Sequence, residues 1–475
     1  MKKHTTTTAT RYLLIPALAF LSSGAWSYAS AATYHVRKDG SDSSCNGSAN
    51  TASSSAPNCA FSTIQKGVNA AQAGDTVTVH AGDYSAAAIS SVRAGTSSAP
   101  ITIQAASGET ATIGAVTVNS GHNYLTVQDF QVTGFQGPAG LFRLNANNTK
   151  ILNNYFYSNK TQDYYDAIGI YMNINTSGVL IDGNTFDGKS TPNKVGPSIY
   201  IPIAAKGSNQ KISHNIFKDM VDPERVMDLN GFSNSTISNN EVRNITYNGA
   251  NGAHVDIFQY WVSGEPTQNV IIENNYFHDL QSQIGDLVDS TTANNITFRN
   301  NVFANMWQGN SAMFGGSPYM KIYNNTFYRV GNGVQPLLFN YAPGANNADI
   351  RNNIFYNCGN SNSMGWYGTN GSNTIKDYNF VANGSNAAKS GFSEPHAVNG
   401  GDPAFVAAYS NCVTNACDFH IKSTSVVKGK GTPISGITTD MSGASRSSAP
   451  SIGAYEAGGT VSASLNPPTN LRYLP

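Results

Sequence analysis

The chain has 475 residues, of which 40% are apolar and 12% are charged, and its 28 basic and 28 acidic side chains give a formal net charge of zero. The charged share is about half of what globular proteins usually carry. A neutral, charge-poor chain lacks the clustered Lys and Arg that bind phosphate backbones, so we expect no nucleic-acid partner.

The first 31 residues have the pattern of a secretory signal peptide. Lys2, Lys3 and Arg11 give a positive start, YLLIPALAF supplies a short apolar core, and Ala29–Ala31 offers the small residues of a cleavage site. We therefore expect the mature protein to begin near Ala32 and to be secreted or periplasmic. The apolar run is too short to cross a bilayer comfortably, and no later stretch is a candidate membrane span.

Five cysteines fit an exported protein. Cys45 and Cys59 lie 14 residues apart, and Cys412 and Cys417 lie five apart, so we predict two local disulfides. Cys358 is left over in an apolar run, where a lone Cys usually packs. No spacing among the cysteines suggests a zinc site.

Residues 61–84, FSTIQKGVNAAQAGDTVTVHAGDY, predict the first regular elements. Ile64, Val68 and Ala71 have the spacing of one helical face, and a strand pattern follows at residues 76–80. A short amphipathic helix at this place would cover an exposed terminal rung, as stacked repeats require.

A phrase of the form Asn-Asn-x-Phe then recurs along the chain, from NNYF at Asn153–Phe156 to NNIF at Asn352–Phe355. Successive copies of its second Asn are separated by 30, 31, 25, 35, 26, 24 and 28 residues. A period in this range indicates a solenoid. The second-position residues are Asn154, Asn184, Asn215, Asn240, Asn275, Asn301, Asn325 and Asn353.

The segments between these copies, such as GIYMNI, KISHNIF and NVIIENNYF, alternate and are rich in Val, Ile, Tyr and Phe. Each repeat therefore holds about three short strands joined by polar turns, and the stacked repeats form a parallel β-helix. Asn tolerates left-handed backbone, and identical Asn residues on successive rungs can form side-chain ladders. We assign the Asn-Asn pairs to structure rather than to chemistry.

The C-terminal end of the solenoid is predicted at SIGAYE, Ser451–Glu456, the last strand-like stretch. The Gly-, Ser- and Pro-rich residues after it are typical of a linker-like tail. The predicted organisation is a signal peptide at 1–31, a β-helix domain at 32–457 and a tail at 458–475.

These patterns resemble a known group. YHVRKDGSDSS, the 61–84 segment, the Asn-Asn-x-Phe coils and the closing IGAYE are similar to secreted bacterial proteins of the pectate-lyase-like superfamily, over roughly residues 33–457. The resemblance implies an all-β fold: a single-stranded right-handed parallel β-helix with a short N-terminal capping helix. It also favours a carbohydrate substrate. That superfamily includes lyases, hydrolases, epimerases and adhesins, so no catalytic residues carry over.

Long substrates would bind such a solenoid in a groove along one stacked sheet, so we look for a polar column across neighbouring rungs. Counting back twelve residues from the repeat Asn of two rungs reaches Asp228 and Asp289. Asp256 lies nineteen residues before the repeat Asn of the rung between them, and removing Trp261–Thr267 as a seven-residue loop places it in the same column. We therefore predict Asp228, Asp256 and Asp289 in register.

The stretch GAHVDIFQYW crosses the middle of these rungs. Strand alternation puts His254, Asp256 and Phe258 on one face, and Val255 and Ile257 on the other. If the apolar pair faces the core, His254 and Asp256 face the groove.

Each residue near this stretch has a predicted role. His254 is the candidate acid or base, or a hydrogen-bond partner of Asp256. Arg225 is placed to hold a sugar carboxylate, or to pair with a neighbouring acid. Tyr260 is a second base candidate or a stacking surface. The substrate-binding candidates are Gln259, Trp261 and Asn230.

The acidic column supports two chemistries. Asp228, Asp256 and Asp289 would bind Ca²⁺, a hard ion that takes oxygen ligands, while a base removes the proton beside a uronate. Alternatively, two carboxylates would act as acid and base in an inverting glycoside hydrolase. The first reading, a polysaccharide lyase acting by β-elimination, uses His, Arg and acids together, so we favour it. A uronate epimerase and a non-catalytic carbohydrate-binding surface protein are further alternatives. We expect a monomer without an organic cofactor.

Overall fold

The computed structural model describes residues 1, 30–134, 140–157, 168–188, 199–247, 255–260, 265–286, 293–306, 317–331, 337–338, 346–358, 366–367, 372–382 and 393–458. The chain divides into two units, Met1–Ala31 and Ala32–Pro475. The second unit carries the fold described below.

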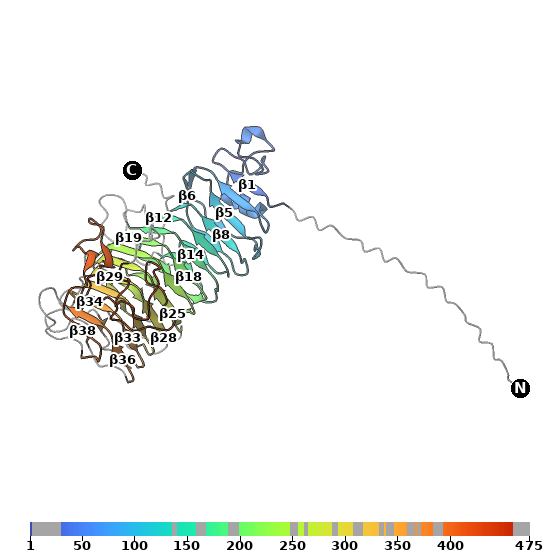
Figure 1. Cartoon of the computed structure of the whole chain (residues 1–475). Helices are drawn as coiled ribbons and strands as arrows, with labels where there is room; N and C mark the ends of the chain where they lie inside the picture. The colour runs from blue at the N-terminus through green and yellow to red at the C-terminus, as the bar shows by residue number, and fades with distance from the viewer. Residues whose placement is uncertain are drawn as a thin grey trace. The chain divides into compact units, whose positions relative to one another are not determined.

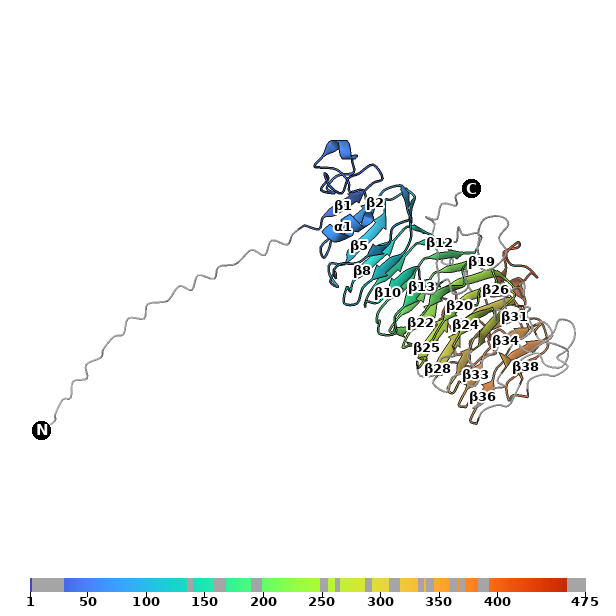
Figure 2. The same ribbon diagram turned by 180° about the vertical axis from the view of Figure 1, so that it is seen from behind.

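Three parallel sheets, which we name A, B and C, run through this unit (Figures 1 and 2). Sheet A follows the order β1 (Thr33–Val36), β2 (Thr76–Val79), β5 (Ile101–Ala105), β8 (Leu125–Gln128), β11 (Lys150–Leu152), β14 (Leu180–Asp182), β18 (Lys211–Ser213), β22 (Thr236–Ser238), β25 (Gln268–Glu273), β28 (Asn294–Arg299), β30 (Lys321–Tyr323), β33 (Asp349–Arg351) and β36 (Ile375–Asp377). It is extended by β17 (Gly207–Ser208) and β21 (Phe232–Ser233).

Sheets B and C follow the same stacking order. Sheet B contains β3 (Gly82–Tyr84), β6 (Ala111–Ile113), β9 (Gln131–Val132), β12 (Tyr155–Tyr157), β15 (Thr185–Asp187), β19 (Ile216–Val221), β23 (Glu241–Thr246), β26 (Tyr276–Leu280), β29 (Val302–Met306), β31 (Thr326–Val330), β34 (Ile354–Tyr356), β37 (Phe380–Ala382) and β38 (Val398–Asn399). Sheet C contains β4 (Ile89–Ser90), β7 (Val116–Val118), β10 (Phe142–Leu144), β13 (Ile168–Met172), β16 (Ile201–Ala204), β20 (Arg225–Asp228), β24 (Asp256–Gln259) and β27 (Gln283–Asp286).

Each coil runs from sheet A through sheet B to sheet C and back to A, so strands distant in sequence pair in parallel. A further parallel pair joins β32 (Leu337–Leu338) to β35 (Trp366–Tyr367). The predicted parallel β-helix, an all-β solenoid, is thus confirmed.

The second Asn of the repeat forms the predicted ladder. Asn184 is representative: its backbone N and its Nδ2 both donate to Oδ1 of Asn215, at 2.9 and 3.0 Å, and Nδ2 also donates to the carbonyl of Ile151. The same pattern links Asn154 through to Asn379. Because these amides are fully buried, every rung fixes the position of the next.

The first residue of each Asn-Asn pair takes the left-handed backbone that the sequence suggested, with φ of 53° at Asn153 and 60° at Asn352. The structure adds a second left-handed row at the entrance to sheet A, which includes Asn234, Asn269 and Asn295. A third row of left-handed residues runs within sheet B: Asp219, Asn244, Asp279, Asn305, Arg329 and Asn357.

Phenylalanine rings stack inside the solenoid beside the ladder. Phe277, Phe303, Phe327 and Phe355 follow one another with ring centroids 4.8 to 5.0 Å apart. Their spacing equals the rung spacing of a parallel sheet. The Phe of the repeat motif therefore fills the core while its neighbouring Asn satisfies the turn.

The predicted cap at the N-terminal end is present. Helix α1 (Ile64–Ala70) buries Ile64, Gly67 and Val68, and the side chain of Val77 of β2 packs closely against the backbone at Gly67. The side chain of Thr63 accepts from the backbone N of Lys66, which satisfies one free donor of the first turn. The other helical piece is the 3₁₀ turn η1 (Ser53–Ser55), and no helix in the described part is long and apolar enough to cross a membrane.

At the other end, the residues after the last rung fold back over sheet B. The antiparallel pair β39 (Phe405–Ala407) and β40 (Asp418–Ile421) packs its Phe405 and Phe419 against Tyr328. The SIGAYE segment lies in the same cluster, with Ile452 and Tyr455 buried. It forms no strand, which corrects the prediction: its apolar side chains cover the outer face of sheet B instead of joining a ladder.

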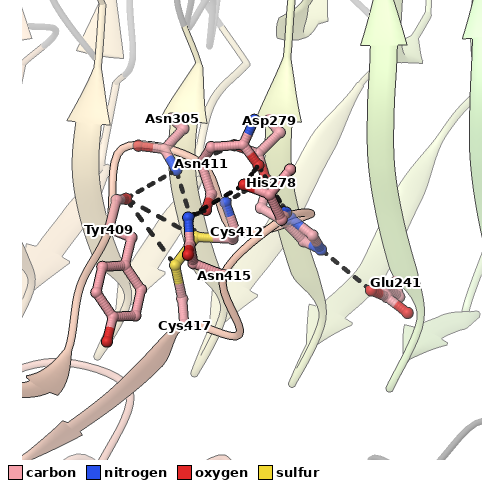
Figure 3. Close-up of a disulfide and its surroundings, with 10 residues drawn as sticks. Glu241, His278, Asp279, Asn305, Tyr409, Asn411, Cys412, Asn415 and Cys417 are labelled. Carbon is pink, nitrogen blue, oxygen red and sulfur yellow. Dashed lines mark hydrogen bonds and ion pairs between the residues drawn. A yellow bond between two sulfur atoms is a disulfide. The ribbon is translucent and has the colours of Figure 1, made fainter.

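Both predicted disulfides form, Cys45–Cys59 and Cys412–Cys417, and Cys358 is buried and free. The second disulfide lies within the returning segment, beside His278, Asp279 and Asn305 of the solenoid (Figure 3). The backbone N of Cys412 donates to Oδ2 of Asp279 at 2.8 Å, and His278 donates to the same carboxylate. Burial opposes charge on His278, but hydrogen bonds to Asp279 and Glu241 outweigh it and raise the pKa of His278.

Candidate active site

The three rungs singled out by the sequence meet in sheet C. Strand β20 pairs with β24, and β24 pairs with β27, all in parallel. In β20 and β24 the order is polar, apolar, apolar, polar. Val226, Met227, Ile257 and Phe258 belong to the buried hydrophobic core; at the polar ends, Asp256 and Gln259 are also buried, whereas Arg225 and Asp228 are partly exposed.

The polar residues therefore form two columns, three residues apart along each strand. The first column is Arg225, Asp256 and Gln283, and the second is Asp228, Gln259 and Asp286. On the two preceding rungs, Ile168 and Ile201 occupy the first column, and Tyr171 and Ala204 occupy the second. The change to polar residues on three rungs marks these rungs as a candidate site.

This register corrects the predicted aspartate column. Asp228 is opposite Gln259 and not Asp256, and Asp256 is opposite Arg225. Asp286 continues the Asp228 column, three residues before the predicted Asp289. The prediction failed because it treated all seven residues of Trp261–Thr267 as insertion, although Thr267 and its neighbours belong to the entrance of sheet A, where Thr267 hydrogen-bonds Leu229.

The alternation predicted for GAHVDIFQYW is also wrong. Phe258 packs edge-on against Phe277 and Phe298 in the core, and Val255 and Ile257 are buried as well. Val255 has a left-handed φ of 49°, so the chain enters β24 through a bend and the simple two-residue period does not hold. Tyr260 is fully buried in the same core, which places its ring away from any groove.

Asp228 is the best-defined acid of the site. Its Oδ1 accepts from the backbone N of Asn230 at 3.1 Å and from the Asn230 side chain, so the predicted substrate-binding residue Asn230 instead holds this carboxylate. Nε of Arg225 lies 3.9 Å from Oδ2. Burial raises the pKa of Asp228 above its ordinary value, while Arg225 and Asn230 oppose that rise.

Arg225 joins the two columns, because it lies opposite Asp256 and near Asp228. Its Nε is buried and makes no hydrogen bond, and its side chain is 13% exposed. The adjacent acid Glu224 accepts from the hydroxyl of Tyr200 at 2.8 Å. The guanidinium is therefore close to acids without being saturated by them.

Two amide side chains complete the patch. Gln259, 4% exposed, and Gln283 each have a buried Oε1 that makes no hydrogen bond. Sequence reasoning missed Gln283, and it assigned Asp289 instead of Asp286 to the aspartate column. The signal that would have found them is the recurrence of polar residues at both ends of a four-residue strand in RVMD, DIFQ and QIGD.

Three predicted residues, His254, Trp261 and Asp289, lie outside the described residues. Asp256 is fully buried at the start of β24. Within the described ranges, the one group of three metal-ligand side chains with converging atoms is His278, Asp279 and Cys412, and the sulfur of Cys412 is committed to a disulfide.

Comparisons with known proteins agree with this architecture. The family model described as a right handed beta helix region matches residues 228–399, and the model of Chondroitinase B matches residues 59–139. With the three stacked sheets, these matches show a right-handed β-helix. No curated protein sequence gave a significant match.

Several solved structures are similar over most of the chain. Pectate lyase Pel9A is 16% identical, covering 90% of this chain and 96% of its own, with a TM-score of 0.49. The complex of XylC with xylose is 11% identical, covering 89% and 98%, with a TM-score of 0.50. A lacto-N-biosidase from Eubacterium ramulus is 12% identical, covering 74% and 67%, with a TM-score of 0.43. At 11% identity, the likeness to XylC extends to the fold alone.

Proposed function

We propose that this right-handed β-helix protein is a polysaccharide lyase that cleaves a uronic-acid-containing polymer by β-elimination on the outer face of sheet C. The observation that carries the proposal is the position of Arg225, an unsaturated cation between two polar columns on three adjacent rungs. The match of residues 59–139 to the Chondroitinase B family model supports an acidic polysaccharide as substrate.

The reaction needs three tasks from the protein. A base takes the proton from C5 of the uronate, the electrons of that bond form a C4–C5 double bond, and the C4–O4 bond breaks. The leaving oxygen then takes a proton. Because the carbanion-like transition state puts charge on the uronate carboxylate, a cation beside that carboxylate lowers the barrier.

Arg225 is assigned to the uronate carboxylate, since a guanidinium matches a carboxylate with two parallel donors. His254, one residue before the start of the bend into β24, is the proposed base. Gln259 presents a buried Oε1 without a hydrogen bond, which suits a sugar hydroxyl. Trp261 is proposed to stack on a sugar ring.

The oxygen donors of the site fit a hard cation such as Ca²⁺. Asp228 and the unbonded Oε1 atoms of Gln259 and Gln283 are all hard oxygen donors, the kind Ca²⁺ takes. These residues would hold the ion, and when bound it would neutralise substrate carboxylate charge. Arg225 can neutralise the substrate carboxylate without a metal, so activity measured after removal of metal distinguishes Arg225 from a bound ion.

A second candidate, an inverting glycoside hydrolase, is favoured by one observation. Asp228 and Asp286 stand in one column with a single rung between them, which separates their backbones by roughly 9–10 Å at the usual strand spacing. Inverting hydrolases separate their carboxyl groups by about 6.5–9.5 Å. The raised pKa of buried Asp228 suits a general acid.

The deciding experiment digests a panel of acidic and neutral polysaccharides, with Ca²⁺ or with EDTA. New reducing ends that appear together with ultraviolet absorbance of unsaturated uronates support the lyase. Reducing ends without absorbance reject it and support the hydrolase. Loss of activity in EDTA, restored by Ca²⁺, would assign Asp228 and its amide neighbours to metal, whereas unchanged activity leaves the carboxylate to Arg225.

A further inference from the structure

A groove of about 270 Å³ lies on the outer face of sheet A, on a different sheet from the candidate active site. Its floor is formed by strands β25, β28 and β30. One wall is the loop Ser435–Ile437 of the returning C-terminal segment. Nη1 of Arg299 donates to the carbonyl of Gly436 at 3.1 Å, which fastens this wall to the sheet.

Strand alternation sets the floor of the groove. Ile272, Phe298 and Ile322 point into the core and are fully buried. The preceding residue on each strand faces outward, so Ile271, Thr297 and Lys321 form a column across three rungs. The floor therefore presents an apolar surface, a hydroxyl and a cation in sequence, about 4.8 Å apart.

A row of amides borders this column. Nδ2 of Asn269 donates to Oδ1 of Asn234 at 2.8 Å, and Nδ2 of Asn295 donates to Oδ1 of Asn269 at 2.7 Å. The row ends where Nζ of Lys321 donates to Oδ1 of Asn295, at 2.8 Å. Every amide oxygen named here accepts a hydrogen bond, and each Nδ2 carries a second N–H, the kind of donor that a sugar hydroxyl accepts.

The charges beside the groove leave Lys321 without a carboxylate among the described residues. Arg299 is paired with Glu273 through two contacts of 2.6 Å. Asp349, the next residue of the column, receives two bonds from Arg351 and one from the hydroxyl of Tyr323. Lys321 therefore keeps a net positive charge in the groove.

We propose that this groove is a second, non-catalytic binding site for an acidic saccharide chain. A uronate carboxylate would pair with Nζ of Lys321, and hydroxyls of the same chain would accept from Asn269 and Asn295. Ile271 offers the flat apolar contact for a sugar face. The inference rests on the proposed function for the class of saccharide, and on the groove alone for its position.

Lys211 provides a matched control, because it lies in the same outward column of sheet A but outside the groove. Calorimetric titration with a four-residue oligogalacturonate and a four-residue oligomannuronate would be made on wild type, Lys321→Ala, Lys211→Ala and Arg225→Ala. We expect two molecules of an acidic probe per wild-type chain, one per chain for Lys321→Ala or Arg225→Ala, and two for Lys211→Ala. A neutral cellotetraose should not bind the groove.

The two proposals fail separately. If the wild type cleaves a uronate polymer but Lys321→Ala and Lys211→Ala bind every probe alike, the groove inference is wrong and the lyase stands. If binding depends on Lys321 but no polymer is cleaved, the groove stands and the lyase falls. Lys321→Gln removes the charge but keeps a polar side chain. If this variant binds the acidic probes as the wild type does, the groove inference is wrong.

Discussion

The carboxylate of Glu394 accepts hydrogen bonds from Asn379, the last asparagine of the buried ladder. Backbone N of Asn379 donates to Oε2 at 3.2 Å, and Nδ2 donates to both oxygens at 3.2 Å. On every earlier rung of the ladder the acceptor is the Oδ1 of another Asn. Burial raises the pKa of Glu394 to about 7, so this end of the ladder titrates near neutrality.

The first prediction follows from that pKa. Because the folded-state pKa is about 7 and the ordinary value is 4.5, the contribution of Glu394 to stability is complete below pH 4.5 and is lost as the pH rises through 7. Glu394→Gln should be more stable than wild type at pH 8, with the difference vanishing by pH 4. Chemical unfolding across this range measures it; parallel stability curves for the two proteins would contradict the assignment.

The second prediction compares two asparagine rows. Asn275→Ala removes a buried amide that bonds Asn301 and the carbonyl of Ile237, and it strands the donors of Asn240, so we expect a loss of about 2–4 kcal/mol. Asn269→Ala changes an exposed row and should cost less than about 1 kcal/mol. Urea unfolding of both variants is the measurement, and equal losses would show that burial does not decide the difference.

The third prediction concerns the guanidinium of the candidate site. Arg225→Ala should lower kcat/KM on a uronate polymer about 10- to 100-fold, the effect of one lost charged hydrogen-bonding interaction. Arg143→Ala is the control, because Arg143 stands in the outward column of sheet C, three rungs before Asp228. Equal activity of the two variants would remove Arg225 from the mechanism.

The fourth prediction separates activity from stability at Asp228. Since burial raises its pKa, the ionised carboxylate destabilises the fold at neutral pH, and this cost disappears as the pH falls below the folded-state pKa. Asp228→Asn keeps an oxygen for Asn230 and should therefore raise the unfolding temperature at pH 7 but not at pH 3, while polymer cleavage falls. A variant less stable than wild type at pH 7 would mean that the pairing with Arg225 outweighs burial.

Local sequence patterns were sufficient for the fold. The Asn-Asn-x-Phe repeat predicted the rungs because each position has its own structural role. The first Asn takes left-handed backbone, the second Asn joins the buried ladder, and the Phe ring stacks in the core. The capping helix at Ile64–Ala70 and both disulfides were also predicted correctly, since they depend on residues close in sequence.

The register of the candidate site could not be predicted. The sequence placed Asp228 and Asp256 on adjacent rungs, and β20 does pair with β24, but the pairing of Asp228 with Gln259 depends on the length of the turn into sheet A and on the bend at Val255. Because the predicted register was wrong by three residues at this turn, it placed Asp256 opposite Asp228, where the structure has Gln259. The SIGAYE segment was wrongly predicted to be a strand. A segment that packs against the face of a sheet and a strand within the sheet both have apolar side chains, so the sequence pattern does not separate them.

The returning segment divides the solenoid into a half that can change length and a half that cannot. Rungs from β26 onward are attached to the segment through Asp279, Asn300 and Asn352, so adding a coil there would break contacts with residues 80 to 146 positions later in the chain. The coils between α1 and β20 have no such partner among the described residues. Duplication or deletion of one coil in the N-terminal half would leave the polar columns intact, so related genes should differ in length there first.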